Sequence, residues 1–140
     1  LGVDRLRPWD LSVDVHNRLA LTPFSDGKQL CDLTIKNFEK ISKDVAQVIR
    51  DLEIKGHLDL DSRLGKAPGG YNYPLFESGY PFIFMNAAGT IRDVVTMVHE
   101  GGHALHSVLT ATLPLLSYKN FPSEVAELAS MSMELFSMEH

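Results

Sequence analysis

The feature that most constrains the fold is the segment His99-Glu100-Gly101-Gly102-His103. Upstream of it, Thr90 and Asp93 have the spacing of a helix capping box, and apolar residues follow at helical intervals, which predicts a helix over about 91–110. Residues four apart lie about 40° apart around a helix, so both imidazoles project from one face. Two adjacent glycines inside a helix cost roughly 1 kcal/mol each relative to alanine. We therefore expect a strand or a substrate to approach this backbone closely.

Two histidine nitrogens on one helix face can hold one Zn²⁺ at about 2.0–2.1 Å, and Glu100 beside the first of them lies close enough to serve a water on the metal. This His-Glu-x-x-His arrangement is typical of zinc metalloproteases. The alternative is a structural helix whose histidines are satisfied at the edge of the core. The apolar stripe beside the histidine face places both imidazoles at that edge, partly desolvated.

A catalytic zinc site needs a third protein ligand and one open position. The last predicted helix, which Pro122 and Ser123 begin, offers several carboxylates: Glu124, Glu127, Glu134 and Glu139. Glu127 and Glu134 are seven residues apart and share a face, so one can bind metal while the other orients a ligand. Glu124 remains a rival. His106 lies about 10 Å along the helix axis from His99, which is too far for it to bind the same zinc ion. It is expected either to have a substrate-side or supporting role or to be an ordinary surface residue.

The remaining pattern predicts a helix-rich α+β fold with three main helices and a small sheet of short strands. Asp26 and Gln29 resemble a capping box before a long amphipathic helix over about 26–54, which Gly56 ends. Alternating apolar residues predict a half-buried strand over 8–16 and a short strand at Leu58–Leu60, and Phe82–Met85 is a compact apolar strand. Residues 67–71 form a turn or an irregular edge.

Composition narrows the class of protein. A chain of 140 residues, 44% hydrophobic and 22% charged, is typical of one soluble globular domain over 1–140. A net charge of −5 argues against nucleic-acid binding. An uninterrupted run of 18 apolar residues is lacking, which argues against a membrane partner, and we expect a cytoplasmic location. The lone Cys31 is expected to be a buried small hydrophobe. The sequence gives no indication of oligomeric state.

His99-Glu-Gly-Gly-His-Ala-Leu-His106, followed by Glu127-Leu-Ala-Ser130 and Glu134, resembles the zinc endopeptidases typified by oligoendopeptidase F and thimet oligopeptidase. The stretches Gly65–Tyr71 and Phe82–Asn86 are similar to the segments that precede the metal helix in that family. The resemblance implies a zincin-like helical bundle with a small sheet around a peptide channel. It also implies one Zn²⁺ held by His99, His103 and Glu127, with Glu100 as general base and Glu134 as a supporting carboxylate.

Members of that family are several times longer, and they place a histidine and tyrosines that contact substrate well downstream of the third ligand. We therefore expect this chain to be an excerpt of a larger catalytic domain, lacking its C-terminal part, with weak or no activity alone. Residues 67–73, with Tyr71 as a substrate-side candidate, form an edge where a peptide backbone could pair. Two alternatives stay open: a metal-free helical binding module, and a structural zinc site closed by Glu124 or Glu134.

Overall fold

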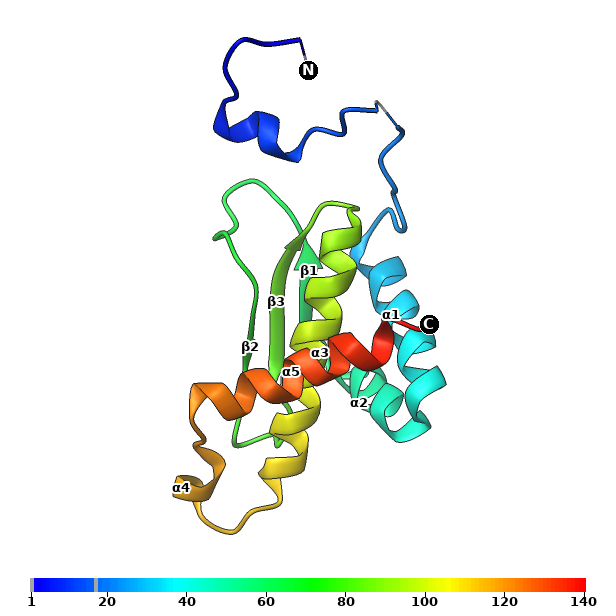
Figure 1. Cartoon of the computed structure of the whole chain (residues 1–140). Coiled ribbons are helices and arrows are strands. Elements are labelled where there is room, and N and C mark those ends of the chain that lie inside the picture. The colour runs from blue at the N-terminus through cyan, green and yellow to red at the C-terminus, as the bar shows by residue number, and fades with distance from the viewer. Residues whose placement is uncertain (1, 17) are drawn as a thin grey trace.

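The computed structural model describes residues 2–16 and 18–140, whose body is a three-stranded sheet with helices packed on one face (Figure 1). This confirms the helix-rich α+β class. The elements in chain order are η1 (Pro8–Ser12, a 3-10 helix), α1 (Gly27–Ile41), α2 (Lys43–Ile54), β1 (Leu58–Asp61), β2 (Tyr71–Tyr73), β3 (Phe82–Ala87), α3 (Ile91–Ala111), α4 (Leu116–Lys119) and α5 (Ser123–Ser137).

The sheet is mixed, with strand order β1-β3-β2. β1 runs parallel to β3, with Leu58 opposite Ile83, while β2 pairs antiparallel to β3, with Asn72 opposite the same Ile83. β3 alternates in burial, so that Ile83, Met85 and Ala87 face the helices. β2 pairs with β3 alone among the described strands, so it lies at the edge of the sheet, as the sequence predicted for this region.

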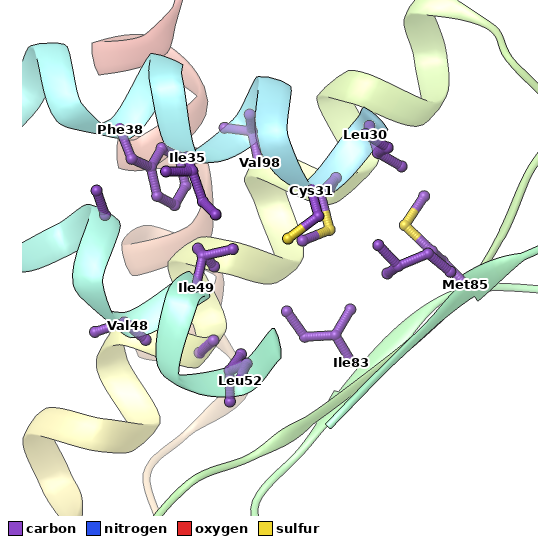
Figure 2. Close-up of a cluster of buried hydrophobic side chains, with 14 of the residues drawn as sticks. Leu30, Cys31, Ile35, Phe38, Val48, Ile49, Leu52, Ile83, Met85 and Val98 are labelled. Atoms are coloured by element: carbon purple, nitrogen blue, oxygen red, sulfur yellow. The ribbon is translucent and has the colours of Figure 1, made fainter. Parts of the chain in front are cut away.

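The hydrophobic core lies between the sheet and α1, α2 and α3. Figure 2 shows Leu30, Cys31, Ile35 and Phe38 of α1 above Ile49 and Leu52 of α2, with Ile83 and Met85 of β3 on the sheet side. Phe38, Ile49 and Leu52 are completely buried. This core supports α3, and Met133 of α5 also belongs to it.

The helix predicted over about 26–54 is in fact two helices, which is a correction. Ser42 has an extended backbone, with φ −164° and ψ 139°, and its hydroxyl accepts a hydrogen bond from the Asp44 backbone N–H at 3.2 Å. Ser42 thus ends α1 and caps α2. The chain turns there, so that Phe38 and Ile49 bury themselves in the same core. Gly56 ends α2 as predicted, at a left-handed φ of +69°.

The strand predicted over 8–16 is wrong. Pro8 opens the 3-10 helix η1, and the Asp10 carboxylate accepts a hydrogen bond from the Arg7 backbone N–H at 2.8 Å. The alternating side chains Trp9, Leu11, Val13 and Val15 are all exposed. A period of two produces a strand only where a neighbouring strand takes up the backbone hydrogen bonds, and this segment stands apart from the sheet (Figure 1). The short helix α4 was not predicted either.

The described residues contain no helix that is both long and apolar enough to cross a membrane.

Cys31 is buried in the core, as predicted, with 2% of its surface exposed. Burial raises the pKa of its thiol to about 12, so the reactive thiolate is nearly absent at neutral pH. We expect the folded protein to react with an aromatic disulfide reagent at pH 8 at least about 100-fold more slowly than the urea-unfolded protein. Stopped-flow absorbance measures both rates. Equal rates would show that Cys31 is accessible in the native protein.

Candidate metal centre

Helix α3 carries the histidine segment, and its start is fixed by local sequence. The Thr90 hydroxyl accepts a hydrogen bond from the Asp93 backbone N–H, and the Asp93 carboxylate accepts one from the Thr90 backbone N–H at 2.8 Å. This is the predicted capping box. It sets the phase of the helix, so that Met97 and Val98 enter the core. His99 and His103 are half-buried, with side chains 26% and 17% exposed.

The two glycines mark where other parts of the chain approach α3. A Cβ on Gly102 would lie 2.7 Å from Ser130 Cα and 3.1 Å from the Ala129 carbonyl oxygen, both on α5. A Cβ on Gly101 would lie 2.8 Å from the ring of Phe38. The predicted close approach is confirmed, but a helix and an aromatic ring make it, not a strand or a substrate. Figure 1 shows α5 crossing α3.

The crossing brings Glu127 of α5 to both histidines. Its Oε2 lies 3.3 Å from His99 Nε2, and its Oε1 lies 3.7 Å from His103 Nε2. Within residues 2–16 and 18–140, this trio is the one cluster of potential metal ligands whose atoms all lie within 4.8 Å of one another. Atoms bound to one tetrahedral Zn²⁺ at about 2.05 Å stand about 3.4 Å apart. The donor set and its spacing therefore fit a zinc ion.

Each histidine ring has a further polar partner besides Glu127. His99 Nδ1 lies 2.7 Å from Glu134 Oε1, while the His103 ring donates to the backbone carbonyl of Ala126. Such contacts orient imidazoles and fix which nitrogen stays free for a metal. Burial lowers the pKa of His103, and the neighbouring His99 lowers it further. Both effects favour the neutral ring, which is the form that binds metal.

Glu100 is turned toward the sheet side of α3 and is buried, with 6% of its surface exposed. Burial raises the pKa of its carboxyl, although the charge of His99 opposes that rise. The backbone N–H of Asn72 on β2 donates to this carboxylate. Its Oε2 has no hydrogen-bond partner among the described residues, which is unusual for a buried oxygen. An unsatisfied carboxylate beside a candidate metal site is suited to accepting a proton.

The other candidates lie farther out. The His106 ring stacks on Phe121 with 4.1 Å between centroids, and burial lowers its pKa. Tyr71 stacks on Phe84 with 4.9 Å between centroids and is half exposed. Glu124 is exposed in the first turn of α5 and outside the histidine–Glu127 cluster.

Sequence reasoning did not identify three groups that touch the site: the Asn72 N–H, the Ala126 carbonyl and the Ser130 hydroxyl. Two of them are backbone groups, which carry no side-chain signal at all. Ser130 could have been noticed only through its place three residues after Glu127 on the same helix.

Comparison with known proteins gives a consistent result. The sequence model described as Peptidase family M3 matches residues 1–140. An oligoendopeptidase F homolog from Lactococcus lactis subsp. lactis (strain IL1403) is 26% identical over 134 residues, and oligopeptidase PepF from Bacillus subtilis (strain 168) is 28% identical over 103 residues. These matches cover 96% and 74% of this chain, but 22% and 15% of the two relatives.

Among solved structures, PZ peptidase A with inhibitor 2 superimposes with a TM-score of 0.86 at 29% identity. The match covers 97% of this chain and 24% of that one. The chain thus spans about a quarter or less of the proteins that it resembles.

Proposed function

Because this chain belongs to peptidase family M3, we propose that it supplies the metal-binding and proton-transferring part of a zinc endopeptidase (an oligopeptidase) with a zincin-like fold. The observation that carries the proposal is the approach of Glu127 to both histidine Nε2 atoms, at 3.3 and 3.7 Å, beside the buried Glu100. Since the chain spans about a fifth of the Lactococcus relative, the activity and peptide substrates of the whole protein are part of this proposal.

Three protein ligands favour a catalytic zinc site over a structural one, because a structural site needs a fourth. Neither carboxylate considered for that fourth position supports it. Glu134 is engaged by His99 Nδ1 at 2.7 Å, behind the ring, and Glu124 is exposed on the first turn of α5. The metal-free alternative has to explain why two histidines and a carboxylate converge while each ring is oriented from behind.

The residues divide the chemistry between them. Zn²⁺, when bound, supplies a Lewis acid that polarises a peptide carbonyl and lowers the pKa of water toward about 7. His99, His103 and Glu127 hold it. Glu100 accepts the proton of the attacking water and passes it to the amine nitrogen as the carbon–nitrogen bond breaks. Its burial shields this carboxylate from competing water.

The outer edge of β2 is the proposed place for the peptide backbone. The Asn72 N–H on this edge donates to Glu100, so the edge runs beside the proposed base. An extended peptide that adds to the edge of a sheet gains backbone hydrogen bonds irrespective of its sequence, which suits an enzyme acting on varied peptides. Residues 67–73, including Tyr71, would then contact the substrate.

Metal content tests the proposal. We expect elemental analysis after dialysis to find about one zinc per chain in the wild type and a much lower content in Glu127→Ala, because two histidines alone leave the ion underligated. Glu124→Ala is the matched control: it removes the same side chain from the same helix and should keep the wild-type content. A wild type that takes up no zinc, even when incubated with it, would favour the metal-free module.

A further inference from the structure

Ser130 on α5 is a completely buried residue whose hydroxyl reaches the proposed third ligand. Its Oγ lies 3.0 Å from the Glu127 carbonyl oxygen, one turn back on the same helix, and 3.2 Å from Glu127 Oε2. A serine hydroxyl has one proton, so the two acceptors share it. The carboxylate is the stronger acceptor because it is charged.

The position of Ser130 is fixed by the helix crossing. A Cβ built on Gly102 would lie only 2.7 Å from the Ser130 Cα. The side chain therefore cannot turn to solvent, and none of its surface is exposed. The hydroxyl is a rigid donor on the same element that carries Glu127.

Glu127 needs such a donor more than the histidines do. Its side chain is 48% exposed and has three rotatable bonds, whereas the rings are held by Glu134 and Ala126. Among the described residues, the carboxylate contacts the two histidines and Ser130 and forms no other hydrogen bond or ion pair. Without the Ser130 hydrogen bond, the Glu127 side chain would keep more rotamer freedom in the metal-free protein. It would therefore lose more conformational entropy when it binds the metal.

We propose that Ser130 is the positioning residue of the metal centre: its hydroxyl holds the Glu127 carboxylate toward His99 and His103 before an ion arrives. This inference rests on the proposed function, and it adds that zinc affinity depends on a neutral group that does not bind the metal. Removing hydrogen bonds of this kind behind metal ligands lowers affinity about 10–100-fold.

The test compares Ser130→Ala with Ser132→Ala. Both variants remove a hydroxyl that bonds to a backbone carbonyl of α5, but Ser132 Oγ bonds to the Leu128 oxygen and forms no hydrogen bond to a carboxylate within the described part of the chain. Zinc affinity is measured by competition with a chromophoric chelator, and the unfolding temperature of the metal-free protein is measured alongside. We expect Ser130→Ala to bind zinc about 10–100-fold more weakly, and Ser132→Ala to stay within about twofold of wild type.

A double variant shows whether Ser130 acts through Glu127. In a Glu127→Ala background, Ser130→Ala should cause no further loss of zinc affinity, since the carboxylate is already gone. An equal loss in both backgrounds would overturn the proposal, as would a Ser130→Ala protein with wild-type affinity. If Ser130→Ala bound zinc with wild-type affinity, the proposed zinc function would still stand. A wild type that binds no zinc would overturn both.

Discussion

Exchanging Glu100 for glutamine is expected to lower the rate of peptide hydrolysis by about 10²–10⁴-fold while leaving about one zinc bound per chain. Glutamine has nearly the same shape as glutamate, but its amide cannot accept a proton. Glu100 is outside the trio that fits the ion, so zinc binding should not depend on it. The measurement is cleavage of a quenched fluorescent peptide by the whole protein to which this chain belongs. Zinc content is determined on the same sample.

Glu124→Gln is the matched control for that experiment, because it makes the same chemical change at an exposed position of α5. It should hydrolyse the peptide at the wild-type rate. A Glu100→Gln protein that keeps its activity would remove Glu100 as the base. A variant that loses zinc together with activity would instead show that Glu100 supports the metal ligands, which the geometry does not predict.

The part of the site on α3 could be predicted because its determinants are local. The capping pair Thr90 and Asp93 starts the helix, and a spacing of four residues puts both histidines on one face wherever that helix lies. The partner on α5 could not be chosen by the same reasoning. Glu124, Glu127 and Glu134 all lie on that helix, and only the crossing near Gly102 decides which of them meets the histidine Nε2 atoms.

The two errors in the fold have different origins. The apolar spacing over 26–54 is correct for both helices, but one capping serine at position 42 was enough to divide them and turn the chain back. The alternation over 8–16 is equally real, yet no strand lies beside it in the part of the chain that the structure describes. A local capping residue thus decided the first region, and the absence of a neighbouring strand among the described residues decided the second.

Replacing Gly102 with alanine should damage both the fold and the site. Alanine favours the helix by about 1 kcal/mol, but the new Cβ would overlap the α5 backbone at Ser130 Cα and the Ala129 oxygen. A backbone cannot swing away as a side chain can, so α5 has to move, and Glu127 moves with it. We expect the free energy of unfolding to fall by about 1–3 kcal/mol and zinc affinity to fall about 100-fold.

Gly101→Ala separates these two effects. Its Cβ would overlap the ring of Phe38 on α1 at 2.8 Å, so it should destabilise the protein by a similar amount in urea denaturation. The contact is with the far end of a side chain on α1, which can shift without moving the α5 backbone, so zinc affinity should stay within about threefold of wild type. If both variants lost zinc affinity equally, general loosening of α3 would explain it. If Gly102→Ala kept wild-type affinity, the helix crossing would not set the spacing of the ligands.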